Sequence, residues 1–129
     1  MRSIRVTLFF LFSFGFSFAM QEQDTADVDK INKQIQLELG KAEASVNMMD
    51  FDGATDHLNT SLELSKKIDN KKHIALTSSI LAKLYYISQD YERASTELQR
   101  AISIQRKIQD DVGLAYSYVN YARIFNALE

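Results

Sequence analysis

A set of residues that recurs after 40 positions constrains this chain more than any other feature of its sequence. An acid precedes an aromatic ring, and small and apolar residues follow at steps of three and four residues. The recurring pairs are Asp50 and Asp90, Phe51 and Tyr91, Ala54 and Ala94, Leu58 and Leu98, and Ser61 and Ala101. Self-similarity at a fixed period is typical of arrays in which one small structural unit stacks on the next. The sequence therefore predicts a repeat protein.

The composition favours helices as the building blocks of this array. The chain contains no Pro and only 4 Gly among its 129 residues, so the commonest breakers of helices are rare. Its 46% hydrophobic and 25% charged residues are those of one globular domain. The absence of Cys excludes disulfides, thiolate nucleophiles and Cys-ligated metal sites. We expect an all-α fold of antiparallel helical hairpins stacked as a short α-solenoid, with two hairpins and a terminal helix.

Apolar residues at helical spacing outline five helices. The first is expected to begin near Asp27 or Asp29, because either acid can cap a helix N-terminus. Loops of two to four residues make successive helices antiparallel. The apolar side of the fifth helix is expected to contain Leu114, Ala115, Tyr118, Tyr121, Ala122 and Phe125. The expected helices span about residues 28–49, 51–68, 71–88, 90–109 and 111–129.

The first 19 residues have a different character from the rest. Arg2 and Arg5 precede an apolar run over residues 6–19, and the small residues Ser17 and Ala19 lie near its end. This pattern predicts a secretory signal peptide, with cleavage after Ala19. The run is shorter than the roughly 20 residues that span a bilayer. An uncleaved membrane anchor is the alternative.

The remaining residues divide into a leader and one helical domain. Residues 20–27 are polar and acidic without apolar periodicity, so we interpret them as a flexible leader. Residues 28–129 form the repeat domain, with repeats at about 30–70 and 71–110 and a half repeat at 111–129.

No group of residues forms a convincing catalytic, cofactor or metal site. The acids from Asp50 to Asp56 lie near His57, but Gly53 is the fourth residue from Asp50, whereas a calcium loop needs Gly at its sixth position. Helix capping explains these acids. His73 has no strained nucleophile turn beside it. The net charge of −2 also argues against nucleic-acid binding, because phosphate recognition needs a basic face.

The spacing of several residues resembles the tetratricopeptide repeat family. The family pattern places Leu, a small residue and Tyr on a first helix, and Ala, an aromatic residue or Leu, and Ala on a second. The matching residues are Leu81, Ala82, Tyr85, Ala94, Leu98 and Ala101, then Tyr121, Ala122 and Phe125, and more weakly Ala42, Ala54, Leu58 and Ser61.

Two features depart from that family. Its usual period is about 34 residues, and Lys66 and Arg106 stand where its Pro would fall. The longer period predicts a longer second helix in each unit. This long form is similar to repeats of exported bacterial proteins and of sensory regions in signalling proteins, which implies a periplasmic location.

The resemblance implies a binding groove lined by the first helix of each unit. The residues expected to bind a partner there are Lys83, Tyr86, Tyr116, Arg123 and Asn126. Aromatic and Arg side chains are common at binding hot spots. Alternatively, Tyr116 buries against a further unit. The family's clamp for a C-terminal carboxylate is not expected, because Leu39 and Glu43 occupy its positions.

The sequence thus predicts an exported, non-catalytic scaffold that binds a protein or peptide, without a cofactor, nucleic acid or small-molecule substrate. The alternative is the N-terminal sensory part of a truncated membrane signalling protein, either a histidine kinase or a transcription regulator. Self-association through the C-terminal helix is also expected, because Tyr118, Tyr121 and Phe125 lack a following helix to cover them.

Overall fold

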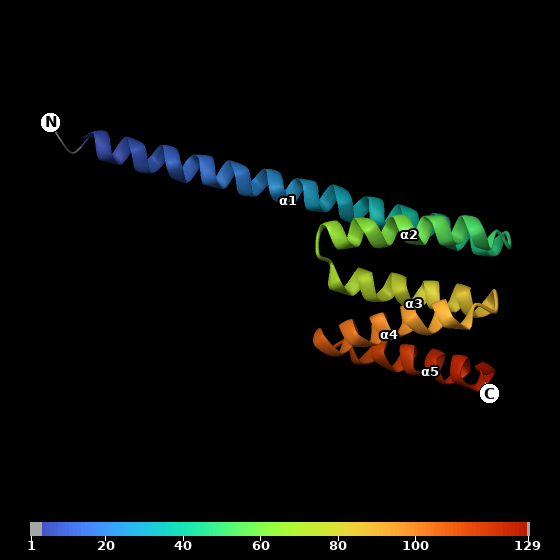
Figure 1. The fold of residues 1–129 in the computed structure, drawn as a ribbon. Helices are drawn as coiled ribbons and strands as arrows, with labels where there is room; N and C mark the ends of the chain where they lie inside the picture. The colour runs from blue at the N-terminus through green and yellow to red at the C-terminus, as the bar shows by residue number, and fades with distance from the viewer. Residues whose placement is uncertain (1–3, 129) are drawn as a thin grey trace.

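The computed structural model describes the backbone of residues 4–128 and the side chains of residues 24–128. This part of the chain forms five α-helices and no strand. Successive helices pack on one another, and α3 also touches α5. Figure 1 shows the stack, with α1 extending well beyond the other helices. The expected all-α stack of hairpins is confirmed. The helices are α1 (Ile4–Asn47), α2 (Phe51–Lys67), α3 (Lys71–Ile87), α4 (Tyr91–Lys107) and α5 (Asp111–Leu128).

Each helix ends in the same way before the chain reverses. One residue of every turn has a left-handed backbone, and these four residues are 20 positions apart. The amide of each donates to a carbonyl three residues back, and the next amide donates to one five residues back. This is the Schellman arrangement, which satisfies carbonyls that the helix leaves free. The left-handed residues are Met49 (φ 61°), Asp69 (51°), Gln89 (61°) and Gln109 (57°).

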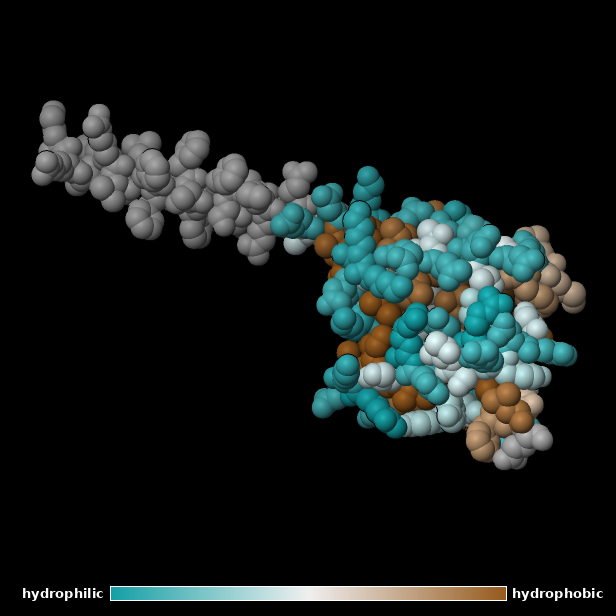
Figure 2. Space-filling view, viewed as in Figure 1, coloured by the Kyte–Doolittle hydropathy of each residue, from teal (hydrophilic) through white to brown (hydrophobic). Residues whose placement is uncertain are grey.

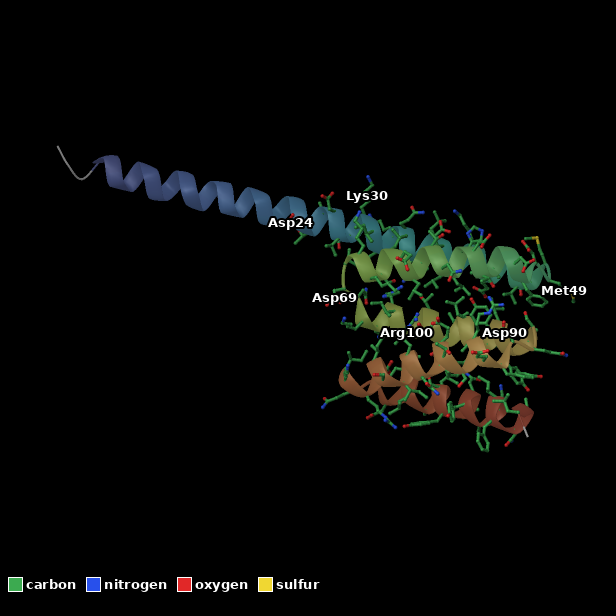
Figure 3. All side chains as sticks on the ribbon, viewed as in Figure 1. Asp24, Lys30, Met49, Asp69, Asp90 and Arg100 are labelled. Atoms are coloured by element: carbon green, nitrogen blue, oxygen red, sulfur yellow. The ribbon has the colours of Figure 1, made fainter. Side chains whose placement is uncertain are left out.

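The residue after each left-handed position caps the N-terminus of the next helix. Its side chain accepts a hydrogen bond from the amide three residues later, as an N-cap does. The distances are 2.9 Å for Asp50 to Gly53, 3.2 Å for Asn70 to His73, 3.1 Å for Asp90 to Arg93 and 3.0 Å for Asp110 to Gly113. In Figure 3 Met49 and Asp90 lie at one end of the stack and Asp69 at the other, so the reversals alternate between the two ends.

The longer period does not come from a longer second helix, contrary to our expectation. Helices α2, α3 and α4 each have 17 residues. The extra length over a period of about 34 residues is therefore shared between the two helices of a unit. One cap, one turn and one helix add up to half of the 40-residue period.

The first helix begins far earlier than the sequence predicted. Helix α1 passes without interruption through residues 20–27, so these residues are helical rather than a flexible leader, and neither Asp27 nor Asp29 starts a helix. No Pro or Gly lies between Met20 and Gly40, and Gln, Glu and Ala favour helices. The side chains of the predicted signal peptide, residues 1–19, lie outside the described residues. In the described part of the chain, no helix is long and apolar enough to cross a membrane.

Two apolar clusters hold the stack together, and small residues lie where helices cross. Ala82 of α3 and Ala94 of α4 are fully buried in the second cluster, as expected for a close approach of two helices. Tyr85 packs against both clusters and so links them. The first cluster contains Ala42, Ala54, Leu58, Leu62, Ile74, Leu81 and Leu84, and the second contains Ala82, Ala94, Leu98, Ile102 and Ile124.

Helix α5 buries a different side from the one its sequence suggested. Its buried residues are Ser117, Asn120 and Ile124. Of the residues expected on its apolar side, only Leu114 packs against the core, whereas Ala115, Tyr118, Tyr121, Ala122 and Phe125 are exposed. Ala82 of α3 lies 40 positions before Ala122 of α5 and packs against α4. No described helix covers Ala122 in the same way. Figure 2 shows apolar residues gathered at the C-terminal end of α5, at the lower right.

The repeated turn predicts a stabilising substitution. Gln89 is exposed and left-handed, a conformation that costs an L-residue about 1–2 kcal/mol but costs Gly little. Gly loses more conformational entropy on folding than Gln does, and this cost offsets part of the relieved strain. Gln89→Gly should therefore raise the free energy of unfolding by about 0.5–1 kcal/mol. Gln89→Val at the same position should lower it, because a branched side chain fits this conformation poorly. Thermal melts measure both, and a lower melting temperature for Gln89→Gly than for the parent chain contradicts the expectation.

Candidate functional site

A groove crosses α1, α3 and α5 and consists of two adjoining cavities. The first has a volume of about 260 Å³ and lies between α1 and α3. The second, of about 100 Å³, lies between α3 and α5. Both include Lys83 and Ile87, so the cavities adjoin along α3. The first is lined by Leu39, Ala42, Glu43, Val46, Leu58, Ile80, Lys83, Leu84 and Ile87, and the second by Ala82, Lys83, Tyr86, Ile87, Asn120, Arg123 and Ile124.

The structure brings together three of the residues that the sequence singled out. Lys83, Tyr86 and Arg123 line the second cavity. Tyr116 and Asn126 are exposed and line neither cavity of the groove. Tyr116 is therefore not buried within this chain.

Sequence reasoning missed Asn120 and Ile87 as groove residues. Asn120 stands 40 positions after Ile80, so a polar side chain replaces an apolar one at an equivalent place in the repeat. That replacement is the signal that could have revealed Asn120. Ile87 is the last residue of α3, where helical periodicity no longer predicts which way a side chain points.

The two cations of the groove are not bonded to other side chains. The other arginines of residues 24–128 are bonded: Arg93 to Asp90, Arg100 to Glu97 and Arg106 to Tyr118. Among the described residues, neither Lys83 nor Arg123 has a hydrogen bond or an ion pair. Both charges are thus available to a bound molecule.

Buried hydroxyl groups set the spacing of the groove walls. The Ser79 hydroxyl donates to the carbonyl of Ala75 at 3.1 Å, so it accepts from the hydroxyl of Ser117, also at 3.1 Å. This bond joins α3 to α5 directly. Ser61 and Thr77 lie 3.4 Å apart and join α2 to α3 in a similar way. Small hydroxyl side chains therefore let these helices approach and also fix their register.

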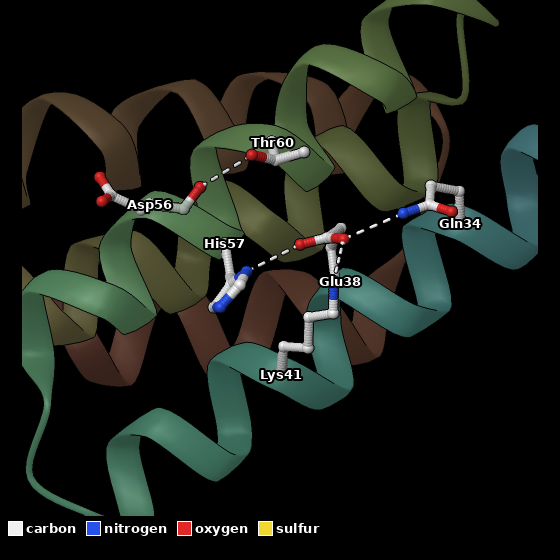
Figure 4. Close-up of polar contacts among 6 residues, drawn as sticks. All are labelled: Gln34, Glu38, Lys41, Asp56, His57 and Thr60. Atoms are coloured by element: carbon white, nitrogen blue, oxygen red, sulfur yellow. Dashed lines mark hydrogen bonds and ion pairs between the residues drawn. The ribbon is translucent and has the colours of Figure 1, made fainter.

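A charged network joins α1 to α2. The carboxylate of Glu38, only 5% exposed, accepts from Gln34 at 3.0 Å, Lys41 at 2.9 Å and His57 Nδ1 at 2.8 Å (Figure 4). Chiefly because Lys41 donates to it, the pKa of Glu38 lies below its ordinary value of 4.5, although burial acts in the opposite direction. His57 thus joins α2 to α1.

The second histidine also joins two helices. His73 Nε2 lies 2.7 Å from the amide nitrogen of Gln36, which donates to it and so joins α3 to α1. Burial, and then the charge of Lys72, lower the pKa of His73. The neutral ring is the form that accepts this hydrogen bond.

A third cavity lies outside the groove, between α4 and α5. Its volume is about 580 Å³, and Tyr118 and Tyr121 form part of its wall. The guanidinium of Arg106 bonds the hydroxyl of Tyr118 and lies 5.7 Å from the centre of its ring. This cavity is larger than the groove cavities but contains none of the residues expected to bind a partner.

No family model matches this chain, and no curated protein matches it.

The Glu38 network predicts a pH-dependent contribution to stability. Glu38→Gln should lower the free energy of unfolding by about 1–3 kcal/mol at pH 7, because the bonds from Lys41 and His57 lose their charged acceptor. Since the pKa of Glu38 is lowered on folding, this contribution is present above pH 4.5 and is lost as the pH falls through the folded pKa.

Urea unfolding of the parent chain and of Glu38→Gln between pH 3 and pH 7 measures the difference in their free energies of unfolding. Glu63→Gln is the control, because Glu63 pairs with Lys66 in an exposed position and such pairs contribute little. A difference between Glu38→Gln and the parent chain that stays constant over this range contradicts the assigned role.

Proposed function

We propose that this chain is an exported, non-catalytic scaffold of the tetratricopeptide type that binds a protein or peptide in the groove of α1, α3 and α5. The observation that carries the proposal is the pair of adjoining cavities, which combines apolar walls with two unbonded cations. The family assignment rests on the residue spacing, and the export on the predicted signal peptide.

The division of the groove into two cavities favours a peptide over a small molecule. One cavity has a volume of about 260 Å³ and the other of about 100 Å³. Separate, adjoining cavities suit the successive side chains of a peptide. The first cavity has apolar walls from Leu39, Val46, Ile80 and Ile87, so an apolar side chain is the best occupant.

Groove binding can be tested by selecting peptides from a random display library on the immobilised chain. Ile87 is 45% exposed and lines both cavities, so Ile87→Glu should weaken selected peptides at least about tenfold. Ile108 has a similar position at a helix end and a similar exposure of 37%, but it lines no described cavity.

The matched variant Ile108→Glu should therefore leave peptide affinity nearly unchanged. Peptides that bind Ile87→Glu as tightly as the parent chain contradict the groove as the binding site. Selection that yields no specific peptide contradicts the proposed function itself.

A second copy of this chain is the partner we propose for the outer side of α5. Tyr118, Tyr121, Phe125 and Leu128 are between 37% and 61% exposed there. These side chains leave on the order of 400 Å² uncovered, so the residues around them must also take part if a symmetric pair is to bury about the 1,000 Å² that a specific interface needs. Only Asp111 and Arg123 are charged in α5, so two copies meet without strong repulsion.

Light scattering coupled to gel filtration should show a dimer whose population rises with concentration. The double substitution Tyr121→Glu and Phe125→Glu should reduce it, because each face would then bring like charges together. Met48→Glu is the control, since Met48 is an exposed apolar residue in the turn before α2. A monomer at high micromolar concentration of the parent chain contradicts this pairing.

A further inference from the structure

The exposed side of α5 corresponds to a side of α3 that is covered in the stack. Four exposed residues of α5 stand 40 positions after four residues of α3 that are buried or half-buried. Helix α4 packs on α3, whereas no described helix follows α5 to pack on it. The pairs, with the residue of α3 first, are Ser78 and Tyr118, Leu81 and Tyr121, Ala82 and Ala122, and Tyr85 and Phe125.

The cavity of about 580 Å³ between α4 and α5 lies at a place that is filled one repeat earlier. Its wall residues Ile102 and Tyr121 stand 40 positions after Leu62 and Leu81. Those two residues belong to the first cluster, and Ile104 of α4 packs against that cluster. A helix laid along α4 and α5 could place a large side chain in the cavity in the same way, because close packing leaves few such voids inside a protein.

Helix α5 has a pattern that is complementary to a second copy of itself. Ala115 and Ala122 are seven residues apart, and so are Tyr118 and Phe125, which places all four exposed residues along one side of the helix. If two α5 helices meet in antiparallel orientation, one register puts Tyr118 of each copy on Ala122 of the other. The same register puts Phe125 on Ala115. Two-fold symmetry makes each contact twice.

A ring beside alanines is also how two antiparallel helices pack within the chain. Tyr85 of α3 packs against the cluster that contains Ala82 of α3 and Ala94 of α4. Alanine lets the backbones approach, and the ring then fills the space between them. Small and large residues on α5 can repeat this packing between two copies.

This register also brings a ring to the cavity between α4 and α5. Phe125 of the second copy lies on Ala115, which is one helical turn from the cavity residue Tyr118. Arg106 forms part of the same wall, and a guanidinium group beside an aromatic ring is favourable. Helix α4 thereby adds contact area that the apolar residues of α5 do not supply alone. Its other residues around the cavity are Gln99, Ile102, Ser103 and Lys107.

We infer that α5 of a second copy lies antiparallel along α4 and α5, with Phe125 of each copy entering the cavity of the other. The inference rests on the pairing of two copies proposed above. It goes further by fixing the direction of the helices, their register and the part that α4 takes in the interface.

A larger apolar residue on α5 tests the close approach of the two helices. Ala122→Leu should weaken the dimer at least about tenfold, because Leu occupies the place of the Tyr118 ring of the second copy. Unspecific apolar association would instead become stronger. Ala127→Leu is the matched control, since Ala127 is also exposed in α5 but lies about 140° around the helix from Ala122. It should leave the dimer unchanged in light scattering coupled to gel filtration.

Exchanging the ring and the alanine between two chains tests the register. Tyr118→Ala and Ala122→Tyr should each weaken the dimer, because one lacks the ring and the other brings two rings together. A mixture of the two variants should form a mixed dimer about as stable as the parent dimer, since each ring again faces an alanine. Native mass spectrometry identifies the mixed dimer by its mass.

Failure of the register differs from failure of the pairing. A parent dimer that Tyr121→Glu with Phe125→Glu reduces, but that tolerates Ala122→Leu, overturns the register and leaves the pairing intact. Two single variants that form no mixed dimer do the same. A parent chain that stays monomeric at high micromolar concentration overturns both.

Discussion

The whole stack depends on a three-residue reversal that occurs every 20 residues. A left-handed residue ends one helix, and the following Asp or Asn caps the next, so orphan carbonyls and orphan amides are both satisfied within one turn. The turn is too short for the chain to move away from the helix that it ends, and therefore each helix lies directly on its predecessor. The equal length of α2, α3 and α4 follows from this constraint.

Close packing of equal helices requires small side chains, and here many of them are hydroxyls. Ser61, Thr77, Ser79 and Ser117 are buried and bond across helix pairs. Such bonds are directional, whereas apolar contacts are not, so they fix how one helix slides along the next. The hydrogen bond between Ser79 and Ser117 joins α3 to α5, and so it also sets the width of the cavity that Asn120 lines.

The groove combines features with different physical origins. Its apolar part follows from repeat packing, because helices α1 and α3 leave a gap where large side chains do not meet. Its polar part does not follow from packing, because Asn120 lacks a partner and Lys83 and Arg123 remain unbonded. Polar groups that the fold does not need are the ones most open to a function in binding.

The sequence by itself determined the helical class, the 40-residue period and four of the five helix starts, because caps and apolar spacing are local properties. It also singled out Lys83, Tyr86 and Arg123, which line one cavity of the groove. Only the tertiary structure decided which side of α5 is buried, since Tyr118 and Phe125 match the core pattern but meet no covering helix. The same holds for Asn120. Its burial and its missing partner depend on the neighbours that α3 and α5 place around it, and no local pattern contains them.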